Sequence, residues 1–193
     1  EAQNRLGTPS ALISKGSNAN SQALPSKATP QLRLVMPSAR VTAKGNKPFR
    51  MSSSKLTSMM IKTLADAETE CPSLSDDSSD SSGWRVSRLN NSQLLAQHKC
   101  WVGAYNVGHG MWVINDSEPY NPKLVTVNAT SYNEGQISSV QKGRGIGDCL
   151  SKADWVWTGQ SFTKSYESTT GLCRMIETGG AWELPTYVAN VKS

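Results

Sequence analysis

The chain has 193 residues, of which 37% are hydrophobic, and a formal net charge of +5 at pH 7. This content supports one modest core, and no run approaches the ~20 apolar residues of a membrane-spanning helix, which excludes a membrane span. The basic excess lies in residues 1–63 but is thinly spread, and Phe49 is the one aromatic residue there. A nucleic-acid-binding surface is a dense basic stripe with aromatic residues that stack on bases. Nucleic-acid binding is therefore excluded as well.

The first 50 residues are predicted to form a linker or extended segment. They are rich in Ser, Asn, Pro and Ala and show no sustained apolar period. Residues 31–37 (QLRLVMP) alternate in polarity and can add a strand. The chain begins at Glu1 without an initiator Met or an apolar signal segment. We therefore expect a mature form or a fragment, with residues 1–50 the possible remnant of an upstream domain.

A single amphipathic helix is predicted over residues 54–69, at the start of a β-rich domain spanning residues 51–193. Ser54 is the expected N-cap. Two methionines on the apolar face suggest an adaptable partner surface, but ordinary core packing is the stronger interpretation. The apolar face has the i, i+3, i+4 spacing of a helix and contains Leu56, Met59, Met60, Thr63, Leu64 and Ala67.

The acidic stretch at residues 73–83 (SLSDDSSDSSG) is interpreted as an exposed loop. Its aspartates lack the alternate spacing, central Gly and closing Glu of a calcium loop. The two histidines have no Cys or carboxylate at short ligand spacing. We therefore expect no metal and no cofactor.

From residue 84 onward the polarity pattern changes from a helical period to alternation. Short β-branched or aromatic stretches, such as KLVTVNATSY at residues 123–132, are separated by Gly, Asn, Asp and Pro. About seven strands without intervening helices predict an antiparallel β-sandwich or bent sheet and argue against parallel βαβ units. Asn90-Asn91 and Thr158-Gly159 are the expected two-residue hairpin turns.

Four widely spaced cysteines indicate two disulfides and an oxidising compartment. None of them has the close spacing of a zinc knuckle or a redox motif. Four cysteines allow three pairings, and we expect sequence neighbours to pair because each bond would then staple one local unit. The expected pairs are Cys71 with Cys100 and Cys149 with Cys173.

The stretch KGRGIGDC at residues 142–149 has three glycines at alternate positions. A dinucleotide-binding loop needs G-x-G-x-x-G leading into a helix, and the flanking residues here are strand-like. We therefore interpret the stretch as a glycine-bent connection that delivers Cys149 to its partner. Lys142, Arg144 and Asp148 remain candidate ligand-binding residues, with a small anion site as the alternative.

Three further residues are candidates for ligand binding. His109 lies between two glycines, but a hydrolytic triad also needs a nucleophile and an orienting group, and no GxSxG elbow is present. Trp155 and Trp157 alternate in a strand and share one face. Filling the core is their ordinary role, and an exposed sugar- or peptide-binding platform is the alternative. No catalytic residue is assigned.

Four stretches occur in a recognisable order: CWVGAYN at 100–106, KGRGIGDC at 142–149, DWVWTGQSF at 154–162 and LCR at 172–174. Together they resemble the DUF1176 family of uncharacterised bacterial envelope proteins. Residues 2–16 are similar to a mid-chain segment of that family. Two departures are Thr158-Gly159, where the family usually has Asp-Gly, and the absence of the family's further N-terminal region. The resemblance implies a signal peptide, a periplasmic location and disulfides, and it implies no activity.

The leading hypothesis is a non-enzymatic periplasmic binding or protein-interaction module, secreted through a signal peptide that this chain does not contain. Its partner would be the missing N-terminal region or another envelope protein, and the sequence does not identify a small ligand. The alternative is an envelope hydrolase acting on cell-wall or glycan material. A structural or stress-related envelope protein is a third hypothesis.

Overall fold

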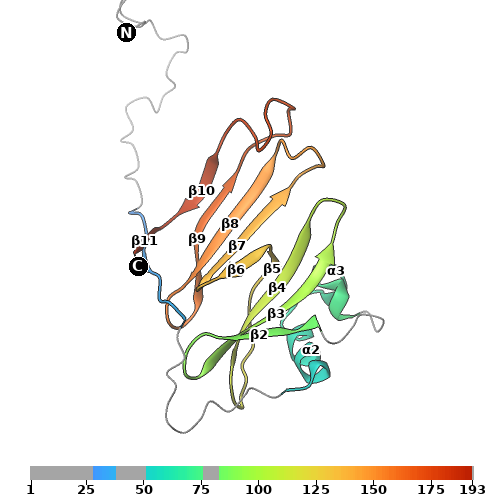
Figure 1. Ribbon diagram of the computed structural model, residues 1–193, viewed down its shortest axis with the longest axis vertical. Coiled ribbons are helices and arrows are strands. Elements are labelled where there is room, and N and C mark those ends of the chain that lie inside the picture. Colours follow the sequence, from blue (N-terminus) through green and yellow to red (C-terminus); the bar gives the residue numbers. More distant parts are fainter. Residues whose placement is uncertain (1–27, 38–50, 76–82, 193) are drawn as a thin grey trace, which may run out of the picture.

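Two antiparallel sheets, preceded by short helices, form most of the described part of the chain, and a two-stranded parallel sheet lies beside them (Figure 1). The structure is a computed structural model that describes residues 28–37, 51–75 and 83–192. The four-stranded sheet contains, in order, β2 (Arg85–Arg88), β3 (Gln93–Val102), β4 (Val107–Asn115) and β5 (Lys123–Ala129). The five-stranded sheet runs β10 (Leu184–Val188), β9 (Phe162–Thr169), β8 (Leu150–Trp157), β7 (Gln136–Lys142) and β6 (Ser131–Asn133).

The chain passes from one sheet to the other at Thr130. Its backbone N–H and its hydroxyl both donate to the carbonyl of Ser138, at 2.8 and 3.1 Å. The stretch 123–132, expected as one strand, therefore supplies β5 to one sheet and β6 to the other. The antiparallel, mostly β fold with two disulfides is confirmed. Its described residues contain more strands than the seven expected, in part because of this corner.

The four-stranded sheet is the middle layer of three, with helices on one face and the five-stranded sheet on the other (Figure 1). Successive side chains of β3 and β4 point to opposite faces, so both faces are apolar. The core beneath the helices includes Leu56, Met60, Leu94, Ala96, Trp112 and Ile114. The core between the sheets includes Leu89, Leu95, Met111, Ala129, Ile137 and Trp157.

The predicted helix at 54–69 is wrong in extent, because it is interrupted. Helix α2 spans Ser53–Ile61, α3 spans Ala67–Glu70, and a 3-10 turn, η1, follows at Pro72–Leu74. Asp66 divides the segment, since its carboxylate accepts the amides of Glu68 and Thr69 and so caps a new helix. No helix in the described ranges is long and apolar enough to cross a membrane.

The N-cap of α2 is Ser52, whose hydroxyl accepts the amide of Lys55 at 3.3 Å, and not Ser54. Met60 is fully buried and Met59 is partly buried against the same core. The methionine face of the helix therefore packs onto the four-stranded sheet, as expected if these methionines are core residues.

The described residues 28–37 lie along the edge of the molecule. Strand β1 (Gln31–Arg33) pairs in parallel with β11 (Asn190–Lys192), and the Val35 amide donates to the carbonyl of Trp157 at 2.8 Å. QLRLVMP does add a strand, but to β11 and to neither large sheet. The remainder of the predicted linker, and residues 76–82 of the acidic loop, lie outside the described residues.

Both predicted hairpin positions lie at connections between paired strands, but neither connection is a two-residue turn. Residues 89–92, which include Asn90-Asn91, join β2 to β3, and residues 158–161, which begin with Thr158-Gly159, join β8 to β9. A two-residue turn that the sequence did not predict, Glu134-Gly135, joins β6 to β7 with φ values of 44° and 87°.

Candidate binding cleft

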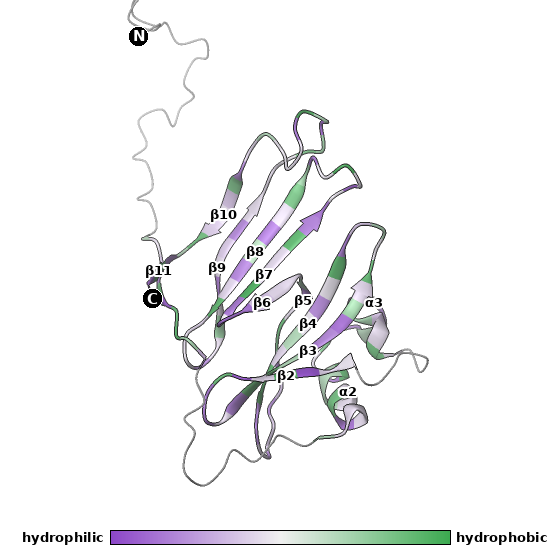
Figure 2. Ribbon diagram, in the orientation of Figure 1, coloured by the Kyte–Doolittle hydropathy of each residue, from purple (hydrophilic) through white to green (hydrophobic). Residues whose placement is uncertain are grey.

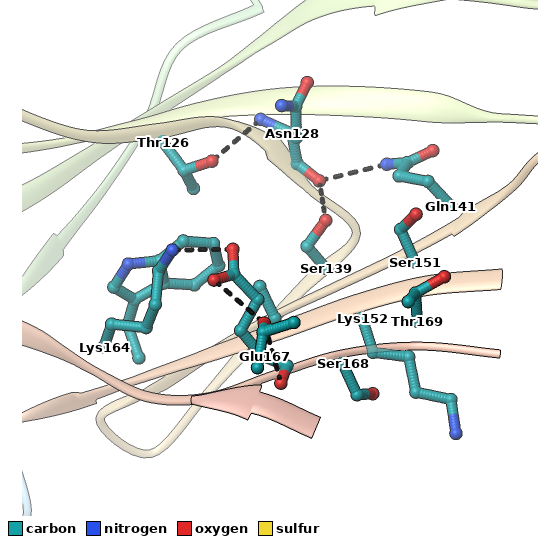
Figure 3. A pocket seen from close by; sticks show the side chains of 13 residues that line it. Thr126, Asn128, Ser139, Gln141, Ser151, Lys152, Lys164, Glu167, Ser168 and Thr169 are labelled. Carbon is teal, nitrogen blue, oxygen red and sulfur yellow. Dashed lines mark hydrogen bonds and ion pairs between the residues drawn. The ribbon is translucent and has the colours of Figure 1, made fainter. Parts of the chain in front are cut away.

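A polar cleft of about 500 Å³ lies between β5 and the inner face of the five-stranded sheet (Figure 3). It occupies a place where the two layers of a β-sandwich would ordinarily bury apolar side chains. Its lining is instead mostly hydroxyl, amide and charged side chains, including Asn128, Ser139, Gln141, Ser151, Lys164, Glu167 and Thr169.

The polarity of this inner face changes along the strands. Inward-facing pairs of β7 and β8 run from Ile137 opposite Trp155, through Ser139 opposite Ala153, to Gln141 opposite Ser151. Ile137 is fully buried in the core between the sheets, and Trp155 packs at its edge. The face is therefore apolar where the sheets are in contact and polar beyond Trp155.

A bulge in β9 places Lys164 and Glu167 on the same face. Trp155 pairs with Lys164 and Asp154 with Tyr166, so Ser165 is the extra residue. Without it, residues three apart in a strand would point to opposite faces. Figure 3 shows the two side chains turned toward each other, and Lys164 Nζ lies 2.8 Å from Glu167 Oε1. Hydrogen bonding to Lys164 lowers the pKa of the Glu167 carboxyl, so this carboxyl is ionised at neutral pH.

Trp155 lies beneath this ion pair. Lys164 Nζ is 5.8 Å from the centre of the Trp155 ring, within the range of a cation–π interaction. The ring is half-buried. Trp155 therefore forms the floor of the cleft at the point where the core ends.

The opposite wall is held by the backbone of β5. The Asn128 carbonyl accepts hydrogen bonds from Ser139 Oγ at 2.7 Å and Gln141 Nε2 at 3.0 Å (Figure 3). Gln141 Nε2 also donates to the Val107 carbonyl at 3.1 Å. Gln141 Oε1 is buried and has no hydrogen-bond partner among the described residues. A buried acceptor without a partner costs free energy, so packing alone gives no reason for a glutamine at this position.

Residues 1–189 match the family described as "Protein of unknown function (DUF1176)". The chain belongs to the DUF1176 family. The match covers nearly the whole chain and agrees with the resemblance found in the sequence. No curated protein and no solved structure matches the chain.

In this DUF1176 protein the glycine-rich stretch forms a structural loop outside the cleft. Arg144 and Asp148 make a two-pronged ion pair, with Nε to Oδ1 at 2.7 Å. This interaction, followed by a 2.6 Å hydrogen bond from the Met175 amide, lowers the pKa of the Asp148 carboxyl. Arg144 is thus already paired with a carboxylate. Lys142 binds Asn106 through its backbone N–H and carbonyl.

The disulfides are Cys71–Cys100 and Cys149–Cys173, the pairs of sequence neighbours named above. At Gly143 an added Cβ would lie 2.7 Å from the Cys149 sulfur, which explains a glycine there. Asp148 also lies beside both sulfurs of the second disulfide. Thiolates, not disulfide sulfurs, bind metals, so this group of three residues makes a poor metal site.

The structure brings one predicted candidate, Trp155, into the cleft. Trp157 is fully buried in the core between the sheets, and His109 lies in β4 with Nδ1 3.2 Å from the Ala129 carbonyl. The residues that sequence reasoning missed are Ser139, Gln141, Lys164 and Glu167. The one feature of the sequence that could have identified them is their polarity at inward-facing strand positions. The bulge that aligns Lys164 with Glu167 has no recognisable sequence pattern.

Proposed function

We propose that this protein is a non-enzymatic binding module of the bacterial envelope and that its ligand is a carbohydrate held in the cleft. The observation that carries the proposal is the polar inner face of the five-stranded sheet beyond Trp155. Apolar side chains are the usual residents of such positions. Polar residues kept there favour a ligand over packing.

The side chains of the cleft match the chemistry of a sugar. Ser151 and Thr169 offer hydroxyls, and Lys164 and Glu167 offer charged hydrogen-bonding groups. Trp155 adds an aromatic surface, and such rings provide large contact area for the apolar face of a sugar ring. A largely preformed pocket of several hundred Å³ with a few convergent polar groups is typical of small-ligand sites.

Binding fits the cleft better than hydrolysis. Glycoside hydrolysis ordinarily uses two carboxyl groups flanking the bond, and the side chains that line this cleft include one carboxylate, Glu167. That carboxylate is bound to Lys164. His109, the histidine considered for a triad, lies outside the lining.

The disulfides support the envelope location. Two disulfides are consistent with an oxidising compartment outside the cytoplasm. Within such compartments the bacterial periplasm is the location that we propose, and cell-surface glycan is then the available ligand class.

The proposal is tested by titrating the protein with three tetrasaccharides: a neutral hexose, an N-acetylhexosamine and a uronic-acid tetramer. We expect at least one to bind and to shift the amide NMR signals of Ser139 and Ser151. Trp155→Ala should weaken that binding about tenfold, the value of a good aromatic contact. Absence of binding by all three sugars would overturn the proposal.

Two variants keep the test independent of folding. Trp155 also touches the core, so Ser151→Trp, at an exposed position of the cleft, blocks the site without removing a core contact. Trp182→Ala removes a tryptophan that is 66% exposed and does not line the cleft. Binding should be lost in the first and unchanged in the second.

A further inference from the structure

We infer that the ligand is an acidic oligosaccharide that extends past Trp155 into a second cavity. This inference rests on the proposed function and specifies its ligand. It follows from how the second cavity joins the cleft and from the charges around it.

The second cavity has a volume of about 360 Å³ and lies between β5 and the start of β9. Trp155 and Lys164 line both the cleft and this cavity. The two spaces therefore adjoin at this pair of side chains, and a ligand chain that passes over the pair would reach both. Together they are long enough for a ligand of more than one sugar unit, because each alone already has the volume of a small-ligand pocket.

The second cavity is basic. Among the described residues, its lining contains Lys123 and Lys164 and no carboxylate. Lys123 is exposed and forms no ion pair with another described residue. Two ammonium groups around a space without a carboxylate favour an anionic group, such as the carboxylate of a uronic acid.

Lys164 can serve either space. Its partner Glu167 lies on the cleft side, and both side chains are more than a third exposed. Ion pairs of this exposure are weak because water screens them. A ligand carboxylate in the second cavity can therefore replace Glu167 as the partner of Lys164 with little loss of stability.

The remaining lining suits a sugar ring. Phe162 and Trp155 supply aromatic faces, and Ser161 and Thr163 supply hydroxyls at the same cavity. A free inorganic anion would gain nothing from the aromatic rings. The combination of rings, hydroxyls and ammonium groups therefore favours an acidic sugar.

The test compares a uronic-acid tetrasaccharide with a neutral hexose tetrasaccharide by calorimetry on the intact chain. We expect the acidic tetramer to bind at least about tenfold more tightly at low salt, the effect of a charged hydrogen bond. This advantage should shrink as salt rises. Lys123→Gln, at a residue that lines the second cavity and not the cleft, should remove most of it and leave neutral binding unchanged. Lys164→Gln should also remove most of it but should change neutral binding as well, because Lys164 lines the cleft. Lys62→Gln, at an exposed lysine on the helical layer, is the matched control and should change neither.

Each outcome decides the inference. Equal binding of the two sugars in the cleft would overturn the acidic ligand while the proposed function stands. A preference that survives both cavity variants, or that falls equally in Lys62→Gln, would show general charge attraction and also overturn it. If neither of these two sugars binds, this inference is overturned, and the proposed function then depends on binding of the N-acetylhexosamine tetramer.

Discussion

The two sheets follow the same alternation of side chains but use it differently. Both faces of the four-stranded sheet are covered, one by the helices and one by the second sheet. The inner face of the five-stranded sheet is apolar up to Trp155 and polar beyond it. One region is thus buried on both faces, whereas the inward face of the other lines an open polar cleft, where we propose that the ligand binds.

The disulfides show the same contrast. Cys71 and Cys100 are both fully buried beneath the helices. Cys149 is 5% exposed and its partner Cys173 is exposed, in loops at the far end of the five-stranded sheet. Figure 2 shows hydrophobic stretches, in green, in the loops at this end of the sheet. Exposed hydrophobic residues in these loops include Ile146, Leu172, Met175, Ile176 and Trp182. One disulfide is part of a core, and the other holds surface loops together.

The largest expected effect of a single substitution lies in the covered region. Trp112 is fully buried, packs against Trp84, and donates from Nε1 to Thr63 Oγ1 at 2.9 Å. Trp112→Ala should lower the free energy of unfolding by about 3–5 kcal/mol, because it leaves a large cavity. Urea unfolding followed by circular dichroism measures the loss.

The matched control is Trp182→Ala, which removes the same side chain from an exposed loop position. Its effect on the free energy of unfolding should stay within about 0.5 kcal/mol. Similar losses in the two variants would contradict the division of the molecule into a covered and an open region.

An intermediate effect is expected from the exposed disulfide. Dithiothreitol without denaturant should reduce Cys149–Cys173 about tenfold or more faster than Cys71–Cys100, since attack requires access to sulfur. Loss of this 24-residue link should lower the free energy of unfolding by about 3 kcal/mol on the chain-entropy model. Mass spectrometry after timed alkylation gives the order, and equal rates would show that the buried disulfide opens in the native protein.

The sequence was a good guide to the covered region. Alternation of apolar residues in β3 and β4 predicts strands, and the i, i+3, i+4 spacing around Leu56 and Met60 predicts a helix packed on them. These signals are local and follow from burial. The helix break at Asp66 was missed because an aspartate can continue a helix or cap a new one, and the choice depends on tertiary contacts.

The cleft was largely hidden from sequence reasoning. Trp155 was identified because alternating tryptophans are conspicuous. Lys164 and Glu167 share a face through a bulge at Ser165, and Asn128 approaches Ser139 because the chain changes sheets at Thr130. Both arrangements depend on strand register and on a corner between sheets, which residue types alone do not specify.

The smallest expected effect distinguishes the two regions by their response to acid. His98 is 6% exposed, its ring lies 4.7 Å from that of Trp84, and burial lowers its pKa from 6.5. The folded protein therefore holds His98 neutral, while the unfolded chain takes up a proton below pH 6.5. The contribution of His98 to the free energy of unfolding is therefore complete above pH 6.5 and is lost as the pH falls below that value. Asp148, whose carboxyl pKa is lowered, supports the surface loops until the pH falls below about 4.

Between pH 6.5 and 5 the free energy of unfolding should therefore fall because of His98 in the covered region. Over the same range the surface loops held by Asp148 should keep their hydrogen-exchange protection. One proton limits the slope to about 1.4 kcal/mol per pH unit. His98→Phe keeps a ring against Trp84 but cannot titrate, so its urea unfolding should be flatter over this range than that of the wild type. If the loops lost protection first, or if the His98→Phe variant kept the wild-type slope, the acid-sensitive group would lie outside the four-stranded sheet and its helices.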